Sequence, residues 1–218
     1  MGIPVLVMGA SGSGKSRSLK NFAKGELSVI NVAGKPLPFR AELATINVRR
    51  KAKEMGVNRY ALIKGVLAKA QAKSIAIDDT QYLLAFDSFD QANVKGYDKW
   101  TMFAVDFEQL ITFVIDELPD DKIVYFLHHT EQTDTGLTKA KTIGKMLDNQ
   151  LTVEGLFSIV LLCVATKDEH KFVTQSFGTT TAKSPEDMLP DEMPNDLKAV
   201  DTAIREYWGL TLENKTEV

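Results

Sequence analysis

Cysteine and long hydrophobic runs are both scarce in this sequence. The only cysteine, Cys163, lies in an apolar run and has no second cysteine to pair with, which excludes an intramolecular disulfide framework and predicts a reducing compartment. The longest strongly apolar run, residues 159–165, is far shorter than the ~20 residues of a membrane span. Residues 1–8 carry no basic leader, so no signal peptide is expected. These absences predict a cytoplasmic protein without a membrane partner.

An excess of charge of one sign is also lacking, although the charges are unevenly distributed. The formal net charge is −3 over 218 residues, but residues 1–73 hold 14 Lys/Arg against 3 Asp/Glu. This asymmetry indicates either a face that binds a polyanion or charges that meet on one surface after folding. The length and the 44% hydrophobic content suit one α/β domain over 1–218, with an acidic C-terminal helix and tail from about residue 195.

A phosphate-binding motif stands near the start of the chain. Residues 9–16 fit G-x-x-x-x-G-K-[ST] between an apolar run suited to a strand and a segment expected to form a helix to about residue 24. Glycines let backbone N–H groups turn toward phosphate, and a helix N-terminus adds positive partial charge. We expect Lys15, facing solvent in the empty loop, to neutralise the β- and γ-phosphates, and Ser16 to ligate Mg²⁺. The residues expected to bind nucleotide are Gly9, Ser11, Gly12, Ser13, Gly14, Lys15, Ser16 and Arg17.

A second informative stretch is Ser74-Ile75-Ala76-Ile77-Asp78-Asp79. An apolar strand that ends in acidic residues downstream of a P-loop is typical of a Walker B element. We expect Asp78 to face Ser16 across the site and to hold the hydrated Mg²⁺.

Apolar runs and helical spacing predict the remaining elements. Strands are expected at 27–32, 122–127 and 156–165, helices at 60–73, 100–118 and 195–208, and a hairpin at 166–177. Residues 40–58 are expected to be partly helical, 86–98 to form a polar connection, and 131–144 a long polar loop. His128 and His129 follow a strand, and neighbours on a strand point to opposite faces, so they are not expected to share a metal.

The order of these elements resembles the RecA-type recombinase core, and most of all the phage-encoded ATP-binding proteins of that superfamily. The resemblance covers residues 3–190 and is carried by the P-loop, by residues 77–79, by His128-His129 and by residues 181–185. It implies a mainly parallel central sheet with helices on both faces and a late antiparallel hairpin. It also implies a Mg²⁺-dependent ATPase that acts on single-stranded DNA in recombination or annealing, in the host cytoplasm if phage-encoded.

The resemblance further implies roles for individual residues. Lys15 and Ser16 match the residues that bind phosphate and Mg²⁺, and Asp78 matches the Walker B acid. His129 matches the polar sensor that links the γ-phosphate to the following DNA-binding loop. Lys183 falls near the lysines that reach a neighbouring subunit's phosphates, which implies a homo-oligomer with nucleotide at the subunit interface; the alternative is an ordinary solvated lysine.

The sequence departs from the family at the water-activating base. The family's glutamate lies at the end of the second strand, where residues 32–35 read Val-Ala-Gly-Lys. Asp79 is the best substitute and Glu42 a more distant one, so hydrolysis is expected to be slow or DNA-stimulated.

DNA contact is expected at the two loops that correspond to the family's DNA-binding loops, residues 86–99 and 130–144. Lysines at 139–145 and the basic run 49–53 would contact phosphates, and Phe86, Phe89 or Tyr97 would stack on bases. ATP is favoured over GTP because an Asn-Lys-x-Asp motif is lacking. Two alternatives stay open: a phosphotransferase acting on a small molecule, and a nucleotide-gated assembly or loader protein.

Overall fold

The computed structural model describes residues 1–218 except 97, 144–151 and 211–218. Its centre is a mixed, mostly parallel sheet with the strand order β3-β2-β4-β5-β1-β7-β8-β9, and β6 pairs with β5 outside this path. The strands are β1 (Ile3–Gly9), β2 (Leu27–Asn31), β3 (Ala44–Asn47), β4 (Ser74–Asp78), β5 (Ile123–Gln132), β6 (Thr138–Ala140), β7 (Ile159–Ala165), β8 (His170–Val173) and β9 (Glu192–Pro194).

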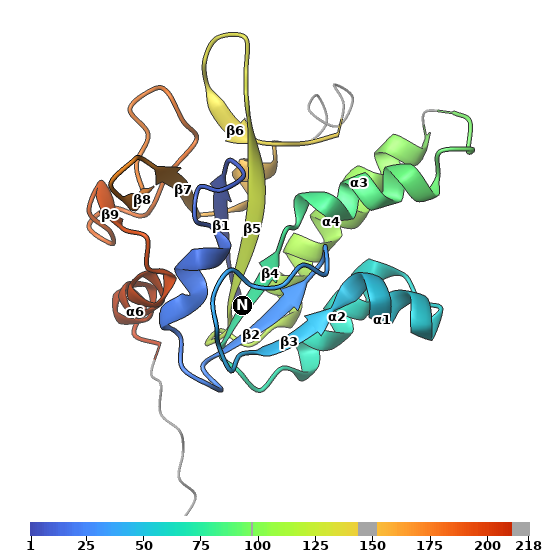
Figure 1. Cartoon of the computed structure of the whole chain (residues 1–218), viewed down its shortest axis with the longest axis horizontal. Coiled ribbons are helices and arrows are strands. Elements are labelled where there is room, and N and C mark those ends of the chain that lie inside the picture. Colours follow the sequence, from blue (N-terminus) through green and yellow to red (C-terminus); the bar gives the residue numbers. More distant parts are fainter. Residues whose placement is uncertain (97, 144–151, 211–218) are drawn as a thin grey trace, which may run out of the picture.

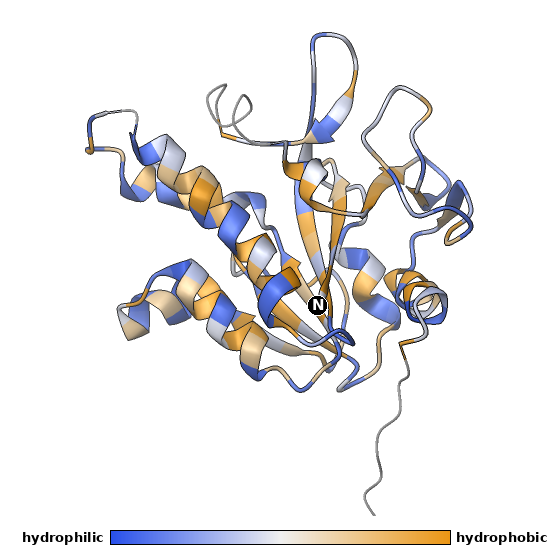
Figure 2. Ribbon diagram, turned by 180° about the vertical axis from the view of Figure 1, so that it is seen from behind, coloured by the Kyte–Doolittle hydropathy of each residue, from blue (hydrophilic) through white to orange (hydrophobic). Residues whose placement is uncertain are grey.

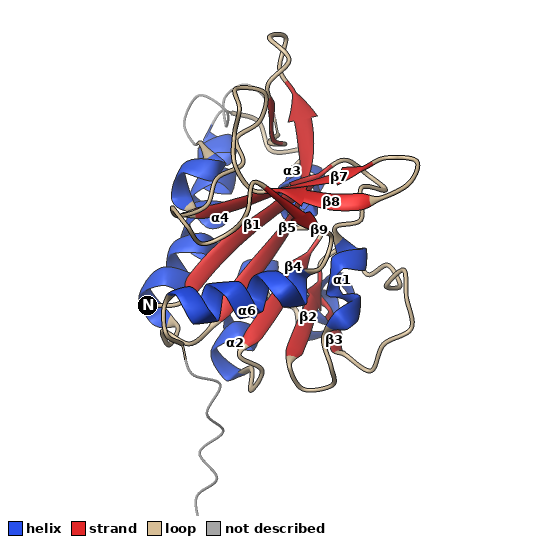
Figure 3. Ribbon diagram, turned by 90° about the vertical axis from the view of Figure 1, so that its left-hand side faces the viewer, coloured by secondary structure: helices blue, strands red, loops and turns tan. Residues whose placement is uncertain are grey.

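Helices cover both faces of this sheet (Figures 1 and 3). The helices are η1 (Ser16–Asn21), α1 (Val48–Met55), α2 (Arg59–Lys69), α3 (Gln81–Asp90), α4 (Asp98–Glu117), η2 (Val153–Leu156) and α6 (Leu197–Tyr207). Alternate residues of β1 point to opposite faces: Leu6 and Met8 pack in the core under α2, α3 and α4, while Val5 and Val7 pack in the core under η1 and α6. This two-sided burial explains the continuous apolar runs of the central strands, which Figure 2 shows as hydrophobic.

The pairing confirms the predicted α/β class with a mainly parallel sheet. Strands β3, β2, β4, β5, β1 and β7 pair in parallel, and β7, β8 and β9 pair antiparallel. In the parallel part, the carboxyl ends of β1, β4 and β5 therefore lie at one edge of the sheet.

Several predicted boundaries are wrong. Residues 86–90 continue α3 and are not part of a polar connection. The helix after the P-loop, expected to reach residue 24, is a 3-10 helix that ends at Asn21, because the buried Phe22 is extended. Strand β3 was not predicted from the sequence. It is a short edge strand with two exposed residues, Ala44 and Thr45, and so has no apolar run.

Residues 131–140 of the segment expected to be a long polar loop form a β-hairpin arm, and residue 144 of that segment lies outside the described residues. Strand β5 continues past the sheet to Gln132, and residues 130–132 pair antiparallel with β6. The arm then joins the loop before β9 through Thr138, whose backbone N–H donates to Thr179 O at 2.9 Å. Backbone pairing, which polarity of side chains does not reveal, orders this segment above the P-loop (Figure 1).

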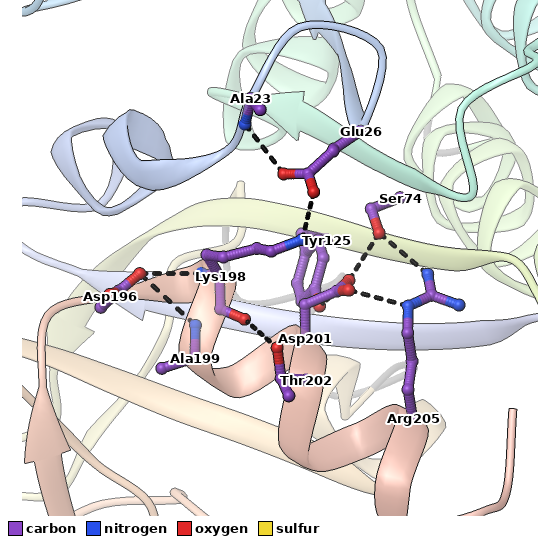
Figure 4. Close-up of polar contacts among 10 residues, drawn as sticks. All are labelled: Ala23, Glu26, Ser74, Tyr125, Asp196, Lys198, Ala199, Asp201, Thr202 and Arg205. Atoms are coloured by element: carbon purple, nitrogen blue, oxygen red, sulfur yellow. Dashed lines mark hydrogen bonds and ion pairs between the residues drawn. The ribbon is translucent and has the colours of Figure 1, made fainter. Parts of the chain in front are cut away.

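Helix α6 is fastened to the sheet by a buried ionic network (Figure 4). Asp201 accepts hydrogen bonds from Tyr125 Oη at 2.8 Å, from Ser74 Oγ at 2.5 Å and from Arg205 Nε at 2.8 Å. Arg205 also donates to Ser74 Oγ at 2.9 Å and to Asp121 O at 3.0 Å. The side chains of Asp201 and Arg205 are 3% and 4% exposed, so each charge depends on the other.

Arg205→Ala is therefore expected to lower the free energy of unfolding by about 3–5 kcal/mol, because it leaves Asp201 buried without its counter-charge. Urea unfolding followed by circular dichroism measures this loss. Arg50→Ala is the matched control, since Arg50 pairs with Glu54 on the surface and its loss should cost about 0.5 kcal/mol or less. Equal losses for the two variants would contradict the assignment.

Candidate functional site

The loop after β1 has the backbone that its glycines predict. Gly12 and Gly14 have φ values of +80° and +103°, a region that favours glycine. A Cβ atom at Gly14 would lie 2.8 Å from Nδ1 of His170, and one at Gly9 would lie 2.4 Å from Oγ of Ser13. The loop is thus closed tightly against its own chain and against β8, and side chains at these positions would open it.

Lys15 does not face solvent, which corrects the expectation from the sequence. Its side chain folds back over the loop, where Nζ donates to Gly9 O at 2.7 Å and to Ala10 O at 2.9 Å, and the residue is only 6% exposed. Burial lowers the pKa of Lys15, against the opposing influence of Cys163, Asp79 and Asp78. The ammonium group is held at the mouth of the loop by carbonyl oxygens that a phosphate oxygen can replace.

Ser16 and Asp78 meet, as the two motifs predict. Ser16 Oγ donates to Asp78 Oδ1 at 2.8 Å, although the residues are 62 positions apart in the chain. Burial, followed by the charge of Asp79, raises the pKa of Asp78. A hydroxyl and a carboxylate at one point are hard oxygen donors of the kind that Mg²⁺ prefers. These two residues fit the Mg²⁺ role assigned to them.

Asp79 lies in a strained turn and contacts two cationic or ionisable side chains. Its φ of +64° is uncommon for a residue other than glycine. Its carboxylate lies 2.6 Å from Nζ of Lys35 and 3.3 Å from Nε2 of His129. Burial by itself would raise the pKa of Asp79, but the contacts with His129 and Lys35 outweigh it and hold that pKa below its usual value. Asp79 is therefore a carboxylate at neutral pH.

Lys35 is a site residue that the sequence analysis did not assign. Asn31, at the end of β2, shapes the turn that carries it: Asn31 Oδ1 accepts from Gly34 N at 2.6 Å, and Asn31 Nδ2 donates to Lys35 O at 2.5 Å. Strands β2 and β4 are neighbours with Asn31 opposite Asp78, so a turn after β2 lies beside the Walker B end. In the sequence, Gly34 after the strand indicates a turn at this position. Only the strand order shows that this turn lies beside Asp79.

His128 and His129 have different environments. His128 is fully buried: Nε2 lies 2.7 Å from Lys141 O and must donate to it, so Nδ1, 2.8 Å from Thr80 Oγ1, accepts. His129 faces Asp79 and makes an edge contact with the ring of Tyr82. The predicted sensor position is thus beside the acidic pair, and the neighbouring histidine ties the turn after Asp79 to the base of the hairpin arm.

Residues of β7 and β8, together with Asn195, hold the P-loop in place. The sequence did not predict this role. His170 Nδ1 lies 2.9 Å from Ser13 O, and Cys163 Sγ donates to the same oxygen at 3.3 Å. Asn195 Nδ2 donates in turn to Cys163 Sγ at 2.9 Å. Burial raises the pKa of Cys163 to about 11, so its thiol stays protonated and acts as a donor. The contacts hold the backbone of Ser13 in place.

These residues enclose a cavity of about 320 Å³ at the carboxyl edge of the sheet. Its lining combines P-loop, Walker B and loop residues: Ser11, Gly12, Gly14, Lys15, Ser16, Arg17, Lys35, Pro36, Pro38, Asp78, Asp79, His129 and His170. Gly9 and Ser13 shape the loop from behind this lining.

Two predicted residues lie away from this cavity. The backbone of Lys183 pairs with Val160 on β7, and Lys183 is not in the cavity lining of its own subunit. Glu42, the second candidate base, lies on the surface outside the cavity lining, paired at 3.3 Å with Lys24, and its side chain is 80% exposed.

The predicted DNA-contacting residues have mixed environments. Phe86 lies under the guanidinium groups of Arg49 and Arg59, so its ring is partly covered. Phe89 is 72% exposed at the end of α3. Lys139 pairs with Glu131 at 3.2 Å. Residues 97 and 145, two further predicted contacts, lie outside the described residues.

Comparisons with known proteins add no family to this picture. Neither a protein-family model nor a curated protein matches the chain. Within the described ranges, no helix combines the length and hydrophobicity required to cross a bilayer. In the same ranges, no group of three or more His, Cys, Asp or Glu side chains forms a metal cluster.

The buried His128 predicts a pH effect on stability. Burial, assisted by the nearby His129 and Lys15, lowers the pKa of His128 from its ordinary 6.5 to about 4. Between these values the unfolded chain binds a proton that the folded chain does not, so stability falls as pH falls through this window. The total loss is roughly 3 kcal/mol, at about 1.4 kcal/mol per pH unit.

His128→Gln should remove this contribution, and its stability should fall less steeply from pH 6.5 to 4 than that of the wild type. Urea unfolding at several pH values measures both slopes, and carboxylates common to the two proteins cancel in the comparison. Parallel pH profiles would show that His128 is not held neutral.

Proposed function

We propose that this protein is a RecA-like P-loop ATPase that binds ATP with Mg²⁺ and hydrolyses it. The observation that carries the proposal is the 2.8 Å contact between Ser16 of the P-loop and Asp78 at the end of β4, beside the ammonium group of Lys15. The glycine-rich loop with its lysine and hydroxyl meets an acid from a distant part of the chain at one edge of the sheet. Nucleoside triphosphate sites use this combination of groups to bind phosphate and Mg²⁺.

Each of these groups has a defined task toward a triphosphate. The N–H groups of the loop receive phosphate oxygens, and Lys15 exchanges its bonds to Gly9 O and Ala10 O for the β- and γ-phosphates. Ser16 and Asp78 would hold Mg²⁺, which would supply positive charge to the phosphate oxygens. Asp79, ionised and facing the same cavity, accepts a proton from the attacking water.

Lys15→Ala should weaken Mg²⁺-ATP binding at least tenfold and reduce turnover to background, because the lysine is the cation nearest the loop. Asp78→Asn should raise the Mg²⁺ concentration needed for half-maximal activity, since an amide lacks the charge of the carboxylate. Titration with a fluorescent ATP analogue and a phosphate-release assay measure these effects.

Lys24→Ala is the matched control, because Lys24 is an exposed lysine that pairs with Glu42 outside the cavity. Thermal melting by circular dichroism verifies that each variant is folded. Wild-type turnover in a purified, folded Lys15→Ala protein would refute the proposed site.

We further propose that the ATPase acts on single-stranded DNA and forms a homo-oligomer. A cavity of about 550 Å³ between α1 and α3 supports the first part: Arg49, Lys53 and Arg59 line it together with Asp87 and Asp90, and Phe89 on α3 is 72% exposed. Asp87 and Asp90 neutralise Arg59, so Arg49 and Lys53 are the cations available to a phosphate backbone. For the second part, Lys183 lies outside its own subunit's cavity, as a residue that serves a neighbour would.

Binding of a labelled single-stranded oligonucleotide should weaken as salt rises and be largely indifferent to sequence, because phosphate contacts release counterions. The double variant Arg49→Ala/Lys53→Ala should reduce the slope of log affinity against log salt by about 1–2, and Phe89→Ala should weaken binding roughly tenfold. Fluorescence anisotropy with a non-hydrolysable ATP analogue measures both. Lack of binding at low salt, or an unchanged slope in the double variant, would contradict this part.

A further inference from the structure

A second lysine faces the acidic end of β4. Lys35 Nζ lies 2.6 Å from Asp79 Oδ2 and 5.7 Å from the centre of the Tyr82 ring, and Lys35 lines the same cavity as Lys15 and Ser16. Its backbone is fixed by the side chain of Asn31, but its side chain is 60% exposed. The side chain of Lys35 can therefore move while its backbone stays in place.

The carboxylate of Asp79 is held by ion-pair contacts. Asp79 Oδ2 lies 2.6 Å from Lys35 Nζ, and Asp79 Oδ1 lies 3.3 Å from His129 Nε2. Among the described residues, Asp79 Oδ2 and His129 Nε2 are nevertheless buried atoms without a partner in strict hydrogen-bond geometry. The contact between Lys35 and Asp79 is therefore an ion pair that an exposed lysine side chain can leave.

The charges in the cavity indicate where Lys35 would go. Asp79 offers one negative charge to Lys35, whereas the terminal phosphate of a nucleoside triphosphate offers two or more acceptor oxygens with greater charge. Lysine is a flexible point charge that suits phosphate. Among the lysines and arginines of this cavity lining, Lys15 is bonded to carbonyl oxygens of the P-loop, and Lys35 makes an ion pair with Asp79, beside His129.

We propose that Lys35 is a catalytic residue that moves its ammonium group from Asp79 to the γ-phosphate of a nucleoside triphosphate bound in the same subunit; this inference rests on the proposed ATPase function. Water oxygen forms a bond to the γ-phosphorus, the bond from that phosphorus to the β–γ bridging oxygen breaks, and the diphosphate leaves with the electron pair. Lys35 balances the charge on the γ-phosphoryl oxygens, and Asp79, released from Lys35, takes the proton of the water.

Lys35 and Lys183 differ in the subunit whose nucleotide each would contact. Lys35 is positioned by Asn31 and by the pairing of β2 with β4, all within one subunit, so it acts in cis. Lys183 does not line the cavity of its own subunit, so in the proposed oligomer it would serve a neighbour's nucleotide. The two lysines therefore predict opposite outcomes when variants are mixed.

The first experiment compares Lys35→Ala, Lys35→Arg and the control Lys24→Ala in turnover and in nucleotide affinity. Lys35→Ala should lower kcat by about 10- to 1000-fold, and Lys35→Arg should recover part of it, because one charge-stabilising donor is lost and then replaced. The preference for a non-hydrolysable ATP analogue over ADP should fall at least ~3-fold while ADP affinity stays within ~2-fold, since ADP lacks the γ-phosphate.

The second experiment mixes variants of reduced activity. Lys15→Ala mixed with Lys35→Ala should show no more activity than the two proteins give separately, because every subunit lacks one cis residue. Lys15→Ala mixed with Lys183→Ala should regain activity if nucleotide lies at a subunit interface. Recovery in the first mixture would overturn the cis assignment.

The outcomes distinguish the two proposals. If the wild type binds and hydrolyses ATP but Lys35→Ala keeps both kcat and the preference for triphosphate, the role of Lys35 is refuted and the ATPase function stands. If the wild type binds neither nucleotide, the ATPase function is refuted, and the role of Lys35 falls with it.

Discussion

The parallel pairing of β1 with β5, in a register that places Gly9 opposite His129, is the constraint on which the site depends. Parallel strands end at a common edge, so the P-loop after β1, the histidines of β5 and, one strand further, the acids of β4 are brought within contact distance. The register is held because both faces of these strands are buried, and a shift by one residue would turn every apolar side chain to the wrong face.

The charges at this edge of the sheet come from the residues that follow β4 and from their contacts. Asp78 and Asp79 place two carboxylates side by side in a buried region, where each disfavours the charge of the other. Asp78 is hydrogen-bonded to Ser16, and Asp79 is balanced by Lys35 and His129. Different partners therefore give two adjacent acids different tasks, a metal ligand and a proton acceptor in the proposed ATPase.

Polar contacts connect neighbouring segments to the site. His170 of β8, Cys163 of β7 and Asn195, which follows β9, hold the P-loop. In the middle of the sheet, His128 of β5 joins Thr80 to Lys141 at the base of the hairpin arm. The arm is therefore connected to the turn that carries Asp79 by neutral hydrogen bonds, which are insensitive to salt and depend on geometry.

The α/β class and the glycine-rich motif of residues 9–16 could be predicted from the sequence, because each depends on a local signal. The meeting of Ser16 with Asp78, 62 positions apart, was predicted from the combination of two such motifs. A glycine-rich loop and an apolar run that ends in Asp are properties of a few adjacent residues. Tertiary structure alone decided that Lys35 faces Asp79, that Lys15 folds inward and that residues 130–140 form an arm. Strand order and backbone pairing join residues far apart in the chain, and neither hydrophobic pattern nor charge at one position records which distant strand will be the neighbour.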